Sequence, residues 1–470
     1  FYAVADRPFG KAGTCRDGVL SDSLSAAGRN IGVWLSDPAG RGVVRFRVGI
    51  SYISVEQARA NLEAEAGEAS FAEVREQSRA IWEETLGRIR VEGGTERERR
   101  IFYTSLYRTC ERMVEQSEYG RYYSGFDRRV HEDARPFYND DWAWDTYRNL
   151  HALGMLLDPE RKADELQSYV RMYRQWGWVP QFPELVEWGG DWFEGASPDW
   201  HGDPMIGNHV ASVAAESIRK GITDFDVETL YEGLRKNALE GTMIPWRAGA
   251  AREPDRFYAE HGYFPALAPG EKEKYPYIDD GWEKRQAVSV TLEHSYDDWC
   301  LARIARYLGR DEDCELFLQR SRNYLNLWNP EIGYFAPRKD RTVRSATERR
   351  VRRPELFRRG QCLCPCFPRA ARHSAADRAD GRSGSLRAPS RRILHSRSEA
   401  RQMEIHGPDA RCHRTSGAHS GGERTCVPHP VALQLCRCGL EDAAPRAADC
   451  RHLVRRPSHG IERRRRRRGA

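Results

Sequence analysis

The chain has 470 residues, of which 31% are charged and 40% hydrophobic, and its formal net charge is +6. This charge is an average, because residues 341–470 carry 31 Arg against 12 Asp and Glu, a net of +19, which leaves −13 for residues 1–340. The overall basicity is therefore no argument for a nucleic-acid partner. No run of 18 apolar residues occurs, so we expect no membrane span.

The composition changes abruptly near Asp340. All 13 Trp and all 20 Tyr precede it, whereas residues 341–470 contain no Trp, Tyr, Lys or Asn and hold 8 of the 12 Cys. Residues 1–340 are numerous enough for a buried core and two domains. The chain starts at Phe1 in a strand-like pattern, without Met or a signal peptide. We therefore expect a fragment whose N-terminus does not reveal its compartment.

The predicted elements change from β to helical along residues 1–340. Residues 1–55 predict part of a β domain, because Val43–Val55 alternates apolar and polar side chains. Residues 56–95 predict a helical linker with a short strand at Ile89–Val91. Residues 96–340 predict helices joined by long loops, which favours an incomplete (α/α)6 toroid over a sheet-based fold. Its expected helices are Glu96–Arg112, Thr146–Leu157, Arg161–Trp176, Asn208–Lys220, Val227–Leu239, Val290–Leu308 and Glu312–Leu327.

The segment Asn139–His151 (NDDWAWDTYRNLH) combines acidic, aromatic and basic side chains at a loop-to-helix junction. A carboxylate beside an indole can bind paired sugar hydroxyls while the ring covers the apolar face of the sugar. Trp144, Asp145 and Arg148 are therefore candidate binding residues, and Arg148 is placed to keep the Asp145 carboxylate ionised. The alternative is that Asp145 caps the helix and the Trp side chains are core. Spacing alone leaves both interpretations open.

A second segment, PMIGNH at Pro204–His209, opens a predicted helix. Asn208 and His209 are candidates for ligand contact, although a helix cap and a packed His are commoner outcomes. No nucleophile-elbow, zinc-protease, P-loop or dinucleotide motif occurs before residue 340.

A third segment, TLEHSYDDW at Thr291–Trp299, places Glu293, Tyr296 and Asp297 on one helical face. Such acidic faces are usually solvated or paired with Arg, so a functional use of Glu293 is the less common interpretation. We nevertheless keep Glu293 as a candidate.

Six ordered segments together resemble glycoside hydrolase family 92, the calcium-dependent exo-acting α-mannosidases. The resemblance runs from Phe1 to about Arg338. It implies an N-terminal β-sandwich joined by helices to an (α/α)6 catalytic barrel, and a secreted, periplasmic or cell-surface location. The segments are Val48–Glu65, Trp82–Thr109, Asp140–Leu153, Met205–Asp226, Ala287–Gly309 and Asn323–Arg338.

The resemblance also implies an activity. An inverting enzyme of this family removes terminal α-linked mannose from glycans: an acid protonates the leaving oxygen while a base activates water. Calcium, bound through oxygen ligands, helps hold and distort the terminal mannose. By motif, the terminal-sugar subsite corresponds to Trp144, Asp145 and Arg148, with Asn208, His209 and Glu293 in support.

The catalytic half of the family pattern is missing. In the family the acid lies in an E-G-N-x-x-Q-Y type segment. Segments of the types G-N-E-P-S-H-H and G-N-x-D-x-G-Q-M-S-A-W supply the calcium ligands and the base. None of these occurs here, so the catalytic residues and metal ligands stay unassigned and we expect an inactive chain. The alternatives are a non-catalytic glycan-binding pseudoenzyme and another (α/α)6 glycosidase such as a glucosidase.

Residues 341–470 allow three interpretations. A nucleic-acid arm would use the Arg463–Arg468 run, but such arms generally contain Lys and not eight Cys. A zinc module would use Cys362, Cys364, Cys366, Cys436 and Cys438, but the C-x-C-x-C run lacks the usual paired spacing. The third interpretation, which we favour, is out-of-frame translation of a G+C-rich gene, since G+C-rich codons encode Arg, Ala, Pro and Gly. We expect this tail to be disordered.

Overall fold

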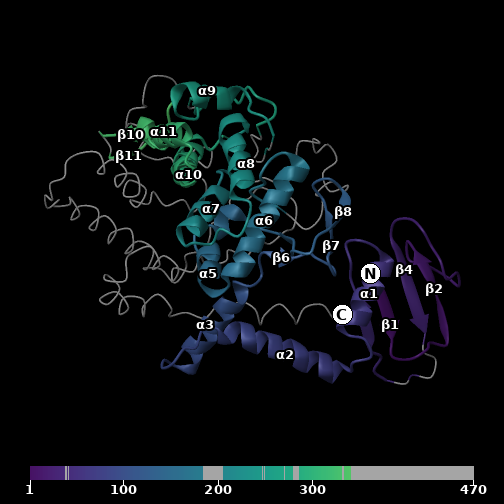
Figure 1. Cartoon of the computed structure of the whole chain (residues 1–470). Coiled ribbons are helices and arrows are strands. Elements are labelled where there is room, and N and C mark those ends of the chain that lie inside the picture. Colours follow the sequence, from purple (N-terminus) through teal and green to yellow (C-terminus); the bar gives the residue numbers. More distant parts are fainter. Residues whose placement is uncertain are drawn as a thin grey trace, which may run out of the picture. The chain divides into compact units, whose positions relative to one another are not determined.

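The computed structural model describes residues 1–36, 40, 42–183, 205–245, 247, 249–268, 270–278, 285–330 and 333–339 (Figure 1). The predicted disordered tail over 341–470 lies outside the described residues. Among those described, no helix is both long and apolar enough to cross a membrane.

The chain begins with two small antiparallel sheets. Strands β1 (Tyr2–Ala5) and β5 (Phe46–Gly49) form one sheet. The other has the order β3-β2-β4, from β2 (Lys11–Arg16), β3 (Val19–Ser21) and β4 (Ile31–Ser36). Gly13 is opposite Trp34, where a Cβ would lie 2.6 Å from the indole, so only glycine lets this ring cross the sheet.

The strand predicted over Val43–Val55 is shorter than expected. It ends at Gly49, and Val55 already begins helix α1 (Val55–Glu65), because the Ser54 hydroxyl accepts the Gln57 N–H and caps the helix. Helix α2 (Phe71–Gly87) and helix α3 (Glu96–Arg108) both start with a capping box. The strand predicted at Ile89–Val91 does not form.

Two short ladders lie between α3 and the helical domain. Strand β6 (Val114–Glu115) pairs with β9 (Tyr138–Asn139), and β7 (Arg121–Ser124) pairs with β8 (Arg129–Glu132). The end of β9 leads directly into the segment that carries Trp144, Asp145 and Arg148.

The helical domain packs around α10 (Ala287–Tyr307), most of whose 21 residues are buried. Helix α10 packs against α7 (Val210–Arg219), α8 (Val227–Glu240) and α11 (Asp311–Arg320). The remaining elements are α4 (Ala143–Thr146), α5 (Leu150–Leu157), α6 (Pro159–Trp176), α9 (Glu253–His261), the 3-10 helix Asn323–Leu327, β10 (Trp328–Asn329) and β11 (Tyr334–Phe335). Small N-terminal sheets followed by a helical domain confirm the predicted fold class.

Three predicted helices have wrong bounds. The helix predicted over Glu96–Arg112 ends at Arg108, and Glu312–Leu327 divides into α11 and a separate 3-10 helix. The helix predicted over Thr146–Leu157 is wrong at its start. Helix α4 ends at Thr146 and α5 begins only at Leu150, with Asn149 at φ −147° outside the helical region. The apolar periodicity continues across this break, which is why the sequence pattern does not reveal it.

Candidate functional site

The candidate site is built on α4, a single helical turn. The Asp141 carboxylate, fully buried, fixes this turn from inside: its Oδ1 accepts the Trp142 N–H at 2.8 Å and the Thr146 hydroxyl at 2.7 Å. Both ends of α4 are therefore held by one carboxylate oxygen. This turn carries Trp144 and Asp145.

Trp144 is 8% exposed and packs in an apolar cluster with Ile206, Phe264 and Val290, so the expectation of a core Trp is correct for its packing. It also has a polar neighbour, because the Arg148 guanidinium carbon lies 4.8 Å from the centroid of its ring. Trp144 therefore packs in the core and also lies against the guanidinium group of Arg148.

Trp142 differs from Trp144 in its contacts. The Phe182 ring stacks on it at 5.1 Å, and the Arg112 guanidinium carbon lies 3.7 Å from its ring centroid. Phe182 and Arg112 both pack against the Trp142 indole, so this ring is not available to stack against a sugar.

Arg148 connects the α4 region to α10. Its Nη2 lies 3.8 Å from Oε1 of Glu293, and its side chain is 35% exposed whereas that of Glu293 is only 5% exposed. The guanidinium also lies 4.8 Å from the Tyr147 ring centroid. The Arg148 guanidinium is therefore partly exposed to solvent, and it lies next to the buried Glu293 carboxylate and the rings of Trp144 and Tyr147.

His209 extends this arrangement into the interior. Its Nε2 lies 3.4 Å from Glu293 Oε2, and its Nδ1 lies 2.9 Å from Asp297 Oδ1. The ring stacks on Tyr147 at 4.2 Å. Gly207, at φ +98°, makes this possible, since a Cβ there would lie 2.5 Å from the imidazole.

Asn208 has a supporting role. Its N–H donates to Asp297 Oδ2 at 2.6 Å, and its side-chain amide donates to the Leu234 carbonyl at 2.9 Å. The residue is almost fully buried. Asn208 therefore holds Asp297, and through it His209.

Asp145 lies inside α4, whose N-cap is Trp142, so the alternative that Asp145 caps the helix is wrong. Its side chain is partly buried. Asp145 and Arg148 do not share one continuous helix, because α4 ends at Thr146, and the spacing argument that paired them therefore does not apply.

The structure thus connects candidates from three segments in one chain of contacts: Arg148 to Glu293, Glu293 to His209, and His209 through Asp297 to Asn208. Of the two usual states of such an acidic face, solvated or paired with Arg, the structure shows the second. Glu293 and Asp297 are both buried, and Glu293 is paired with Arg148. Asp297 was not among the candidates, although its place four residues after Glu293 was a usable signal.

Two further buried groups of α10 are electrostatically perturbed. Burial raises the pKa of Asp298 from 3.8 to about 6, although Arg320 at 3.1 Å opposes this shift. Burial lowers the pKa of His294 from 6.5 to about 4, against the opposing effect of Asp297. Burial and the neighbouring Glu293 also raise the pKa of Tyr147 well above 10.0.

The resemblance implies calcium, with its ligands in segments that do not occur in this sequence. Among the described residues, no group of three or more His, Cys, Asp or Glu side chains is placed to hold a metal ion. Arg148 and the imidazole of His209 also make the surroundings of Glu293 a poor fit for a cation. The arrangement instead suits hydroxyl groups, which can accept from a guanidinium and donate to a carboxylate.

A model of the glycosyl hydrolase family 92 catalytic domain matches residues 57–355, well over half of the chain. The chain belongs to glycosyl hydrolase family 92. An uncharacterized secreted glycosidase from Arthroderma benhamiae is 26% identical over 312 residues, which are 63% of this chain and 33% of that relative.

Solved family 92 structures are also similar. An inverting mannosidase from Bacteroides thetaiotaomicron is 29% identical with a TM-score of 0.60, and the match covers 72% of this chain and 42% of that one. An α-mannosidase from the same bacterium, in complex with mannoimidazole, is 24% identical with a TM-score of 0.55, over 73% of this chain and 42% of that one. The second likeness shows the fold alone. The chain spans less than half the length of the relatives it matches.

Proposed function

We propose that the described part of this chain is the sugar-contacting part of an inverting exo-α-mannosidase that acts on terminal α-linked mannose of secreted or surface glycans. The observation that carries this is the contact chain from Arg148 through Glu293 to His209, which joins candidates from separate segments. The similarity to an inverting mannosidase at 29% identity supports the choice of sugar and stereochemistry.

In this proposal each residue has a distinct part in binding. The partly exposed Arg148 donates hydrogen bonds to sugar hydroxyls. The Asp145 carboxylate accepts hydrogen bonds that sugar hydroxyls donate. Glu293 keeps the guanidinium in place, and the rings of Trp144 and Tyr147 fix its plane. His209 and Asp297 in turn hold Glu293 from the interior.

The proposal gives this chain no hydrolytic step. The family's acid and base segments do not occur in its sequence, so no residue is assigned to protonate the leaving oxygen or to activate water. Calcium is proposed for the family's full-length site only, because the described residues do not fit it. No step of the reaction is therefore derived through the metal. We expect sugar binding without turnover.

Calorimetric titration of the full chain tests the binding. Mannoimidazole should bind, and glucoimidazole, which differs in configuration at one ring carbon, should bind more weakly. Glu293→Gln should lower mannoimidazole affinity by about tenfold, because it weakens the hold on Arg148. Glu84→Gln, at an exposed position on α2, is the matched control and should leave affinity unchanged.

The outcomes separate the alternatives. Tighter binding of glucoimidazole would replace the mannosidase assignment with a glucosidase-type subsite, and no binding of either compound would contradict the proposed site. Hydrolysis of an aryl α-mannoside, measured with and without a chelator, tests the expected inactivity. Turnover that a chelator abolishes would show that this chain holds the acid, base and metal after all.

A further inference from the structure

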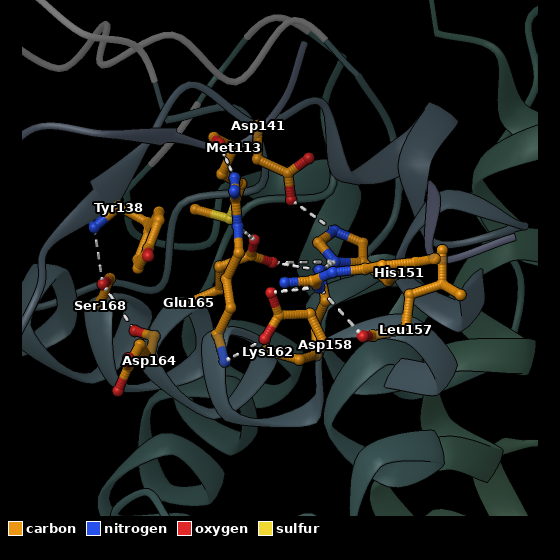
Figure 2. Close-up of polar contacts among 12 residues, drawn as sticks. Met113, Tyr138, Asp141, His151, Leu157, Asp158, Lys162, Asp164, Glu165 and Ser168 are labelled. Atoms are coloured by element: carbon orange, nitrogen blue, oxygen red, sulfur yellow. Dashed lines mark hydrogen bonds and ion pairs between the residues drawn. The ribbon is translucent and has the colours of Figure 1, made fainter. Parts of the chain in front are cut away.

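A buried chain of charged groups lies behind the candidate site and has no part in the proposed sugar contacts. It runs from Asp141 through His151 and Lys162 to Glu165, and all four side chains are almost fully buried (Figure 2). His151 Nε2 lies 2.8 Å from Asp141 Oδ2, His151 Nδ1 lies 3.0 Å from Lys162 Nζ, and Lys162 donates to Glu165. Arg161 Nε also donates to Glu165, at 3.1 Å.

The contacts of His151 select one tautomer. An ammonium group only donates, so the Lys162 contact needs a lone pair on His151 Nδ1, which leaves the proton on Nε2, where it donates to Asp141.

The far end of this chain is the carboxylate that holds α4. Asp141 Oδ2 accepts hydrogen bonds from His151 Nε2–H and from the Tyr169 hydroxyl at 2.7 Å, while its Oδ1 accepts from the Trp142 N–H and the Thr146 hydroxyl. A helix of a single turn is unstable by itself, so α4 depends on such external bonds.

We propose that His151 is a positioning residue: in its neutral Nε2–H form it links Lys162 to Asp141 and thereby holds α4, with Trp144 and Asp145, in the geometry that binds sugar. The effect of His151 on sugar binding rests on the proposed function. The link to α4 rests only on the contacts described here.

Two measurements on the full chain test the link without sugar. Nitrogen-15 NMR of labelled His should show the His151 proton on Nε2; an Nδ1–H tautomer or an imidazolium overturns the proposal. Hydrogen exchange of the Trp142–Thr146 amides should be about tenfold faster in His151→Phe, which keeps a ring but neither polar contact. His151→Gln, which can donate to Asp141 and accept from Lys162, should exchange like the wild type.

Helix α8 (Val227–Glu240) is the internal control, since its amides should be unaffected in both variants. Equal protection of Trp142–Thr146 in all three proteins, or equal loss in His151→Gln and His151→Phe, overturns the proposal. If His151→Phe also loses protection in α8, the variant has unfolded. The proposal is then decided by the tautomer of His151 in the wild type and by the exchange rates in His151→Gln.

Mannoimidazole affinity on the same samples separates this inference from the proposed function. If the wild type does not bind mannoimidazole, the proposed function is contradicted. The link from His151 to α4 is then decided by the tautomer and the hydrogen-exchange measurements alone. A wild type that binds, together with a folded His151→Phe that binds equally well, overturns the positioning role and leaves the proposed function standing. The expected result is an affinity about tenfold lower in His151→Phe and restored in His151→Gln.

Discussion

Replacing Gly154 with Ala brings a methyl group against the buried Lys162 side chain. A Cβ at Gly154 would lie 2.7 Å from Lys162 Cε and 3.0 Å from its Nζ. The ammonium group is not free to move away, since it lies 3.0 Å from His151 Nδ1 and donates to Glu165. The substitution therefore tests whether the buried chain is as tightly packed as described.

The magnitude follows from two opposing effects. In an ordinary helix interior, Gly→Ala gains up to about 1 kcal/mol of stability. Displacing Lys162 weakens a charge-assisted hydrogen bond that is worth about 1.5–3 kcal/mol, and leaves charged partners buried, which adds to the loss. We expect Gly154→Ala to lower the free energy of unfolding by about 1–3 kcal/mol.

Urea unfolding followed by circular dichroism measures this change, with Gly87→Ala as the matched control. Gly87 is the last residue of α2, and no atom lies within 4 Å of a Cβ built there. The control should be neutral or slightly stabilising. Equal stabilisation by the two substitutions would refute the reasoning, because Lys162 would then not fill the space beside Gly154.

Three more predictions concern the pH dependence, the site and the tail. The raised pKa of Asp298 gives stability that is present below pH 3.8 and is lost as the pH rises through about 6. The lowered pKa of His294 acts in the opposite direction: its stability is present above pH 6.5 and is lost as the pH falls through about 4. Between pH 4 and 6, Asp298→Asn should therefore become more stable relative to wild type as the pH rises, by up to about 3 kcal/mol, and His294→Gln less stable by a similar amount; parallel profiles in unfolding titrations would contradict both shifts. Arg148→Lys keeps the charge but loses the planar group beside Trp144, and should weaken mannoimidazole binding by about tenfold in calorimetry, whereas unchanged affinity would exclude a role for the guanidinium plane. The nucleotide sequence around codon 340, read in its two other frames, should contain the missing acid and base segments of the family, and their absence from both frames would refute the out-of-frame interpretation.

Most helix positions were predictable because their signals are local. Capping sequences such as Ser70 with Glu73 are read from neighbouring residues, and α2 begins directly after Ser70, inside the predicted helical linker. The break between Thr146 and Leu150 was not predictable in this way. It depends on Asp141, whose own position is set by His151 and Tyr169 from later in the chain.

The sequence supplied candidate residues for the site but not the contacts between them. Family resemblance pointed to Arg148, His209 and Glu293 without indicating that they form one chain of contacts. The sequence placed Glu293 and Asp297 on one face of α10 but left open whether this face is solvated or paired with Arg. Its partner Arg148 lies about 145 residues away in the sequence, and periodicity carries no information about such partners.

In the proposed function, Arg148, Glu293 and Asp145 belong to a subsite for terminal mannose. A crystal structure of the full chain with mannoimidazole would show where the sugar binds. We predict the sugar ring beside Arg148, with ring hydroxyls about 3 Å from its guanidinium and from the Asp145 carboxylate. A sugar bound elsewhere in the chain, with Arg148 making no contact to it, would contradict the account.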